Sequence, residues 1–189
     1  VRRVSNAMTP RILSIAGSDS SGGAGIQADI KTITMLGGYA MTAITAVTAQ
    51  NTLGVQGVEA LSPQFVLQQV DSCLSDIGAD AIKIGMLGSP ETARLLAERL
   101  DTFAGPIVFD PVMVATSGSV LVDADTIRAF ETLLDRAAVA TPNLGELAAL
   151  GGEYGALVAN VEPQLCRAVA SLLVGGGRSE FVPGFQAGD

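Results

Sequence analysis

The sequence has no histidine and no tryptophan, and only 2 of its 189 residues are cysteines. Without histidine, a Ser-His-Asp or Cys-His catalytic relay cannot form, and a zinc site loses one of its main ligand types. Cys73 and Cys166 stand among aliphatic residues in expected helices, so we interpret both as buried small hydrophobic residues in a reducing compartment. We therefore expect a cytoplasmic protein whose chemistry depends neither on histidine nor on disulfides.

Basic residues are scarce as well. The chain has 11 lysines and arginines against 19 acidic residues, which gives a net charge of −8. No basic run follows Arg2-Arg3, so nothing would neutralise a row of phosphates, and we expect no nucleic acid partner. The acidic balance does not exclude ATP, because backbone N–H groups and Mg²⁺ usually meet its phosphates.

Long apolar runs are missing, although hydrophobic residues make up 48% of the chain. Polar residues or glycine interrupt every apolar stretch before the ~18 residues that a membrane span needs, so we expect no membrane partner. The length suits one α/β domain with a sizeable core. Residues 1–7 lack the apolar region of a signal peptide, and we interpret them as a leader or cloning scar before Met8.

What the sequence does contain is an alternation of short β-branched runs with segments of helical period. Strands are expected over residues 11–16, 39–47, 80–84, 106–109 and 138–140. Helices are expected to start near Gly25, Ser62-Pro63, Ser89-Pro90 and Asp123. This alternation predicts an α/β fold with a parallel sheet covered on both faces. The pattern degrades after Leu150, so we expect one folded unit over residues 8–150 and a divergent segment over 151–189.

The expected sheet also predicts where a ligand would bind. In parallel α/β sheets, ligands bind beyond the carboxyl ends of the strands. That rule selects residues 17–25, 48–51, 85–88, 110–118 and 141–146. All of these segments carry small, polar or acidic residues, which favours a site at this edge.

The stretch from Gly17 to Gly25 follows a strand and opens a helix, where backbone N–H groups can approach an anion or a substrate. It fits neither of two familiar patterns. Its P-loop spacing lacks the Lys-Ser/Thr pair, because Gly23-Ala24 stands there. Its match to the dinucleotide fingerprint lacks a ribose-binding acid, because the second strand leads into Gln50. Its abundance of glycine and serine still favours a functional loop over a plain turn.

Several polar residues allow two interpretations each. Asp29, in the first helix, is either functional or an acid favoured by the positive end of the helix. Lys83, inside a strand that otherwise reads as buried, must pair, titrate or emerge at the strand end. Asp110 ends one strand, and Asn143 and Glu146 follow another. They could hold Mg²⁺ through water, or the latter two could merely cap the next helix.

Blocks of sequence in a fixed order make the pattern specific. The blocks are Ile15–Lys31, Thr45–Val55, Lys83–Leu87, Asp110–Gly118 and Thr141–Glu146. Together they resemble hydroxymethylpyrimidine/phosphomethylpyrimidine kinases over about residues 11–150. The resemblance implies a ribokinase-like fold, three α/β/α layers around a mostly parallel sheet, incomplete at the C-terminus. It also implies transfer of phosphate from ATP, in two steps, to make the pyrimidine diphosphate used in thiamine synthesis.

The resemblance also assigns roles to single residues. Those that resemble the pyrimidine pocket are Gly17, Asp29, Gln50, Met86 and Val112. Asp29 and Gln50 would hydrogen-bond the ring or its amino group, and many relatives have Glu where Gln50 stands. Those that resemble the Mg-phosphate side are Asp110, Asn143 and Glu146. Implied as well are ATP and Mg²⁺, with Glu146 as a metal ligand through water, and a homodimer.

One part of the family pattern has no counterpart in these 189 residues. The family takes its anion hole and base from a late Gly-Thr-Gly-Cys or Gly-x-Gly-Asp block and part of its nucleotide site from a Lys-Gly-Gly block. We interpret their absence as truncation with a frame change after Leu150, which leaves the catalytic residues unknown, and we expect turnover to be absent or very weak.

Three alternatives are kept. They are a pyridoxal kinase-type enzyme on the same fold, a remnant that only binds the pyrimidine, and a nicotinamide-dependent dehydrogenase. The missing ribose-binding acid and the absence of histidine disfavour the last.

Overall fold

The computed structural model describes residues 9–113 and 124–150. Within these ranges a six-stranded sheet has the order β3-β2-β1-β4-β5-β6, and every neighbouring pair is parallel except β2 and β3. The strands are β1 Arg11–Asp19, β2 Tyr39–Asn51, β3 Gly54–Ala60, β4 Ala81–Ile84, β5 Ile107–Phe109 and β6 Val139–Ala140. The helices are α1 Gly25–Met35, α2 Pro63–Asp76, α3 Pro90–Arg99, α4 Ala124–Arg136 and α5 Leu144–Ala149. The predicted α/β fold with a mostly parallel sheet is confirmed.

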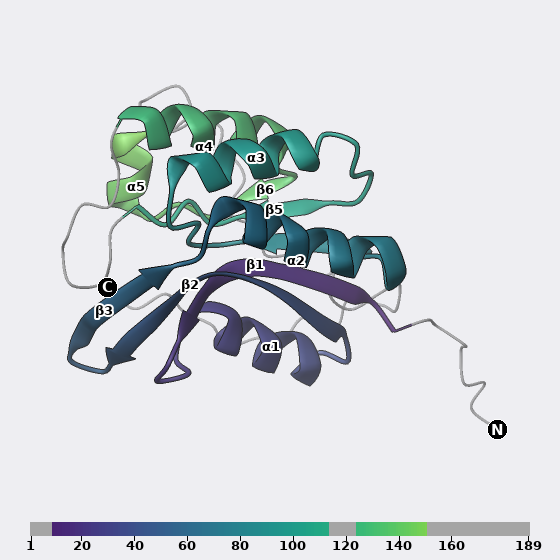
Figure 1. Ribbon diagram of the computed structural model, residues 1–189, viewed down its shortest axis with the longest axis horizontal. Coiled ribbons are helices and arrows are strands. Elements are labelled where there is room, and N and C mark those ends of the chain that lie inside the picture. The colour runs from purple at the N-terminus through teal and green to yellow at the C-terminus, as the bar shows by residue number, and fades with distance from the viewer. Residues whose placement is uncertain (1–8, 114–123, 151–189) are drawn as a thin grey trace, which may run out of the picture.

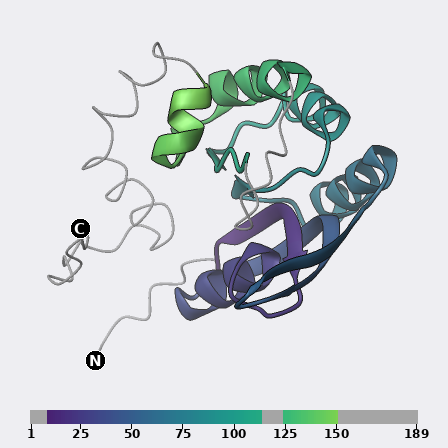
Figure 2. The ribbon, with the colours of Figure 1, turned by 90° about the vertical axis from the view of Figure 1, so that its left-hand side faces the viewer.

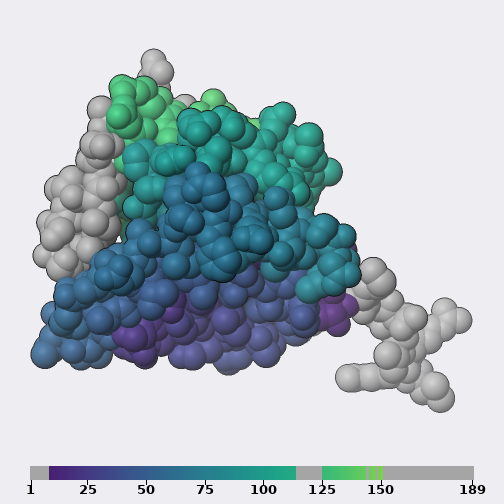
Figure 3. Space-filling model, viewed as in Figure 1, coloured from purple at the N-terminus to yellow at the C-terminus, as the bar shows by residue number. Residues whose placement is uncertain are grey.

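The helices lie on both faces of the sheet. In Figure 1, α2, α3 and α4 lie above the strands, and α1 lies below β1 and β2. Figure 2, turned by 90°, shows the same separation of α1 from the other helices. The space-filling view in Figure 3 shows the side chains of α2 and α3 closing over one face. Both faces of β1 are therefore covered, as a parallel strand requires.

Alternation along the strands assigns residues to the two faces. Leu13 and Ile15 of β1 join the core cluster, packed with Ile82 and Ile84 of β4. That cluster also contains Phe109 and Phe130, whose rings meet edge to face with centroids 5.2 Å apart. Ser14 and Lys83, between these apolar residues, face α1 instead, because both contact Asp29 of that helix. The α1 side is thus the more polar face.

The expected helix starts at Ser62 and Ser89 are confirmed. Each serine side chain accepts a hydrogen bond from the backbone three residues on, and a proline follows it at the first helical position. α1 begins differently. Its N-cap residue, Ala24, has no side chain that can cap the helix, so the N–H groups at this end need an acceptor from elsewhere.

The sequence-based boundaries were wrong in three places. β2 runs on to Asn51 and turns back into β3, an antiparallel edge strand that the periodicity did not reveal, because its residues are mostly exposed. β1 continues to Asp19, three residues into the expected loop. Phe103, which the helical period placed on the helix that begins at Ser89-Pro90, packs against the core from beyond α3, which ends at Arg99.

Three further predictions can be placed. Cys73 of α2 is half-buried against the core, and burial raises the pKa of its thiol, in line with an unreactive packing role. Asp123, Cys166 and the expected segment 151–189 lie outside the described residues. Among the described residues, no helix combines the length and apolar character needed to cross a membrane.

Candidate active site

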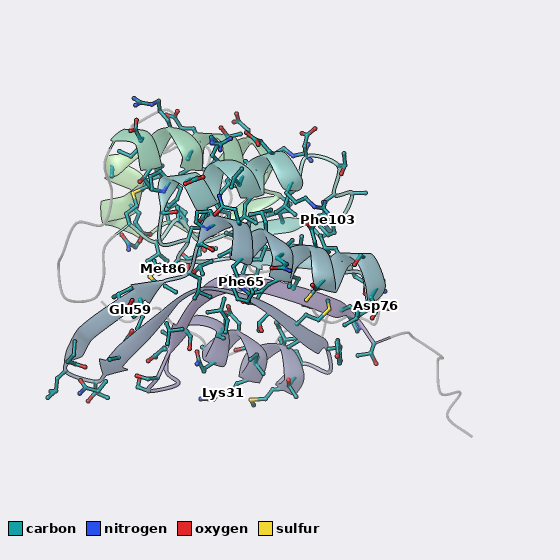
Figure 4. All side chains as sticks on the ribbon, in the orientation of Figure 1. Lys31, Glu59, Phe65, Asp76, Met86 and Phe103 are labelled. Carbon is teal, nitrogen blue, oxygen red and sulfur yellow. The ribbon has the colours of Figure 1, made fainter. Side chains whose placement is uncertain are left out.

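A cavity of about 320 Å³ lies at the carboxyl ends of the parallel strands. Four of the five predicted segments contribute to it, through Gly17, Gln50, Met86 and Asp110 among others, and the segment 141–146 does not line it. Val55 and Val58 of β3 and Thr126 and Phe130 of α4 add walls that the sequence had not indicated. In Figure 4, Met86 lies between the β2–β3 hairpin and the helices above it. A second hollow, between α2 and α3, lies away from the strand ends and from these residues.

Close packing explains two glycines at the cavity. A Cβ on Gly17 would overlap the end of the Met86 side chain. Gly25, whose φ is 55°, packs against the carbonyl of Gly17, and a Cβ there would overlap that oxygen. Thr45 donates from its hydroxyl to the carbonyl of Met86 at 2.6 Å. The floor of the cavity is therefore a tight stack of backbone and one thioether.

The N–H groups of the glycine-rich loop are already used within the protein. The carboxylate of Asp19 accepts from the backbone N–H groups of Ser21, Gly23 and Ala24 at 2.8–2.9 Å, and from the Ser21 hydroxyl. Donation by Ser21 and by these N–H groups lowers the pKa of Asp19. One of these donors, Ala24, is the N-cap residue of α1, so Asp19 fixes the loop directly before that helix. The N–H groups of Ser21, Gly23 and Ala24 are therefore not available to an anion in this arrangement.

Gln50 is fixed at the end of β2 from two sides. The Ser20 hydroxyl donates to the Gln50 carbonyl and accepts from the Gln50 N–H, both at 2.8 Å. Thr48 Oγ1 lies 2.9 Å from the carbonyl of Ser18 and 3.2 Å from the side-chain amide of Gln50. A bulge in β3 next to this pair shifts the register by one residue. The glycine-rich loop and the end of β2 thus form one hydrogen-bonded unit.

Asp29 lies beneath the cavity rather than in its lining. Its carboxylate accepts from Ser14 Oγ at 2.6 Å and from Lys83 Nζ at 3.0 Å. Lys83 does line the cavity, and a Cβ on Gly85 would come within 3.0 Å of its ammonium. Glycine at this position therefore leaves room for the lysine to emerge at the end of β4. The sequence allowed Lys83 to pair, to titrate or to emerge at the strand end. The structure shows that it pairs with Asp29 and that it emerges at the end of β4.

Asp110 is the acid of the cavity that is least satisfied electrostatically. Burial raises its pKa, and the negative charges of Glu146 and Asp29 act in the same direction, while Lys83 opposes them. The raised pKa of Asp110 is thus mainly an effect of burial, which disfavours the charged form. A cation beside it would offset this penalty.

Asn143 and Glu146 cap α5. Asn143 Oδ1 accepts from the Glu146 N–H at 3.0 Å, and Glu146 Oε2 accepts from the Asn143 N–H at 2.9 Å, which makes a reciprocal capping box. Glu146 Oε1 also accepts from the N–H of Met113, at 3.3 Å, next to the end of β5. The capping interpretation is therefore realised, and the buried carboxylate remains close enough to Asp110 to affect its pKa.

The predicted pyrimidine-pocket residues are brought together with one exception. Gly17, Gln50, Met86 and Val112 line the cavity, and Asp29 does not. Sequence reasoning missed the supporting residues Ser20 and Thr48 and the internal role of Asp19. An acid next to serines and glycines is a signal for a side chain that folds back on the loop, and it could have indicated Asp19. Among the described residues, no group of three or more acidic or cysteine side chains forms a ready metal site.

Comparisons with known proteins agree with one another. A family model described as phosphomethylpyrimidine kinase matches residues 19–181. A hydroxymethylpyrimidine/phosphomethylpyrimidine kinase of Rhizobium meliloti is 46% identical, over 94% of this chain and 66% of that enzyme. A thiamine biosynthesis multifunctional protein of Corynebacterium efficiens is 49% identical, over 78% of this chain and 20% of its own length. The chain thus spans less than two thirds of the length of either relative.

Solved structures show the same likeness. A crystal structure of phosphomethylpyrimidine kinase from Clostridium difficile superposes with a TM-score of 0.72 and 39% identity, over 83% of this chain and 71% of that one. A pyridoxal kinase from Staphylococcus aureus, in complex with AMP-PCP, superposes with a TM-score of 0.67 and the same 39% identity, over 76% of this chain and 52% of that one. Both are kinases, and the fold of the described residues is theirs.

Proposed function

The chain belongs to the phosphomethylpyrimidine kinase family, and from that premise we propose that its described residues form the substrate-binding part of an ATP-dependent pyrimidine kinase. The substrates would be hydroxymethylpyrimidine and its monophosphate, phosphorylated on the way to thiamine diphosphate. The relatives' names support the substrate class, and the kinases among the solved structures support ATP as the phosphate donor.

The observation that carries the proposal is the lining of the cavity. Gly17, Met86 and Val112 offer backbone and apolar surface, and Gln50 offers a hydrogen-bonding amide beside them. A small cavity with apolar walls and few polar groups suits a flat heteroaromatic ring, and its volume lies at the lower end of the range for ligand sites.

Asp110 and Glu146 are the residues that would hold Mg²⁺. The charge of Glu146 contributes to the raised pKa of Asp110, which marks a carboxylate that a cation would stabilise. Mg²⁺ is usually bound by one or two carboxylates and several waters, so two acids are a fitting donor set. The ion would supply neutralisation of phosphate charge. Asn143 would act through Glu146, because the reciprocal cap fixes that carboxylate.

The residues of this chain would contribute positioning to the reaction. In phosphoryl transfer the substrate hydroxyl attacks in line, and catalysis consists mostly of alignment and charge stabilisation. Gln50, fixed through Ser20 and Thr48, would orient the ring, and the stack of Gly17 on Met86 would limit its tilt. Asp29 would act from beneath, by pairing with Lys83 at the cavity wall.

A pyridoxal kinase-type activity is the second candidate. It is favoured by pyridoxal kinases among the solved structures, at 39% identity. The two substrates differ at the ring edge, where the pyrimidine carries an amino group and pyridoxal a hydroxyl.

The test is calorimetric binding of hydroxymethylpyrimidine and of pyridoxal to the whole chain, with ATP consumption in Mg²⁺ as a second readout. The variant Gln50→Leu should weaken pyrimidine binding about tenfold. The matched control, Gln68→Leu on the exposed surface of α2, should bind like the wild type. Binding of neither compound by a folded chain would sink the proposal, and tight binding of pyridoxal alone would favour the second candidate.

A further inference from the structure

Thr48 has two hydrogen-bond contacts and one hydroxyl proton. Its Oγ1 lies 2.9 Å from the carbonyl oxygen of Ser18 and 3.2 Å from Oε1 of Gln50. Both neighbours are acceptors, and one proton cannot serve both fully. The Ser18 carbonyl can only accept, so the shorter contact takes the proton.

The remaining contact becomes a hydrogen bond only if the Gln50 amide is turned. A half-turn of the Gln50 amide group exchanges the positions of Oε1 and Nε2. Which of the two orientations is correct is decided from the hydrogen bonds that each one makes. Nε2 then donates to Thr48 Oγ1, and Thr48 donates to Ser18, which gives a chain of donors with a single direction. Thr48 is only 6% exposed, so water would not readily replace either bond.

Among the described residues, Thr48 is the hydrogen-bond partner of the Gln50 amide, while the main chain of Gln50 is fixed separately. Ser20 fixes both main-chain polar groups of Gln50 at 2.8 Å. Among the described residues, the second heteroatom of the Gln50 amide has no partner, and the side chain lines the cavity. Whether Oε1 or Nε2 of Gln50 faces the cavity therefore depends on which way the amide is turned.

We propose that Thr48 is a specificity-determining residue, which orients the Gln50 amide so that its carbonyl oxygen faces the cavity. An acceptor there selects a ligand with an amino group on the ring edge and rejects one with a carbonyl or another acceptor in that position. This inference deepens the proposed function and rests on it for the identity of the ring. The orientation itself concerns the free protein.

The orientation is tested without ligand, by NMR on ¹⁵N-labelled protein. Gln50→Glu removes the side-chain NH₂ signal of Gln50 and so assigns it. We expect this NH₂ to exchange more slowly than that of exposed Gln68 and to shift in Thr48→Val. In Thr32→Val, the same change on the exposed side of α1, the signal should stay in place. Fast exchange and no response to Thr48→Val would overturn the proposed orientation.

The selectivity is tested by calorimetry with hydroxymethylpyrimidine and its oxo analogue, in which a carbonyl replaces the amino group. The wild type should prefer the amino compound by about tenfold or more, and Thr48→Val should remove most of that preference, because the freed amide can turn to meet either ligand. Thr32→Val should retain the preference. Gln50→Glu should retain it too, since a carboxylate offers only acceptors.

Each result has a defined meaning. Equal weakening of both ligands in Thr48→Val, with their ratio unchanged, would overturn the specificity role and leave a structural one. Preference of the wild type for the oxo analogue would overturn the orientation. If the wild type binds neither compound, the proposed function fails, and the NMR experiment still decides the orientation.

Discussion

Two aspartates lie at the same edge of the sheet, Asp19 at the end of β1 and Asp110 after β5, yet their environments are opposite. Asp19 is surrounded by donors from its own loop, and its pKa is lowered. Asp110 is partly buried near other acids, and its pKa is raised. The first carboxylate has its partners within the protein, and the second is a partly buried carboxylate whose charged form an external cation could stabilise. Position in the fold alone therefore does not separate an acid that is hydrogen-bonded within its own loop from one that is proposed to face a ligand.

The largest expected effect comes from neutralising the second aspartate. Asp110→Asn should weaken binding of Mg·ATP by about tenfold or more, because a metal-facing carboxylate is lost. The same change should raise the Tm, because it removes a charge that burial disfavours. Titration calorimetry and thermal unfolding measure the two effects, and Asp76→Asn on α2 is the control. A lower Tm in Asp110→Asn would contradict the contrast between the two aspartates.

Lys83 is the cation that moderates the charge around Asp110. Lys83→Met should lower the free energy of unfolding by about 2 kcal/mol, because Asp29 would be left partly buried without its ion pair. It should also raise the pKa of Asp110 further. Urea unfolding of Lys83→Met, Asp29→Asn and the double variant would measure the coupling. If the effects of the two single changes simply add, the pair contributes nothing.

Asp19→Asn tests the aspartate whose carboxylate accepts hydrogen bonds from its own loop. An asparagine oxygen can replace part of the carboxylate, but its NH₂ group would face the N–H donors of the loop. We expect the Tm to fall by a few degrees and pyrimidine binding to weaken, because the loop also carries the Ser20 clamp on Gln50. Thermal unfolding beside Asp76→Asn checks this. An unchanged Tm would mean that other contacts fix the loop.

The smallest expected effect is a difference in pH dependence between Asp19 and Asp110. Asp19 has a lowered pKa when folded, so its stabilisation is complete at neutral pH and is lost only as pH falls through that low value. Asp110 has a raised pKa when folded, so its ionisation penalises the fold at neutral pH, and the penalty fades as pH falls toward the ordinary aspartate value of about 4.

Thermal unfolding between pH about 7 and about 4 measures this difference. The advantage of Asp110→Asn over the wild type should shrink across this range, and the deficit of Asp19→Asn should persist. Parallel curves for both variants would contradict the assigned directions.

The sequence by itself determined the framework of this protein. Periodicity and the Ser-Pro starts located most of the helices and parallel strands, because these signals are local. The carboxyl-end rule selected the segments that contain Gly17, Gln50, Met86 and Val112, and these residues line one cavity, since parallel strands bring their ends to one edge. β3 was missed because an exposed edge strand need not alternate in hydrophobicity.

Only the tertiary structure decided which polar groups are free. Asp19 turns its carboxylate onto its own loop, Asp29 pairs with Lys83 from 54 residues away, and Thr48 connects the loop to Gln50. The last two outcomes depend on distances between segments far apart in the chain, and the free energy of a hydrogen bond or an ion pair changes steeply with such distances and with burial. Residue type and spacing along the sequence could have indicated the local contact of Asp19, but they carry no information about the two long-range ones.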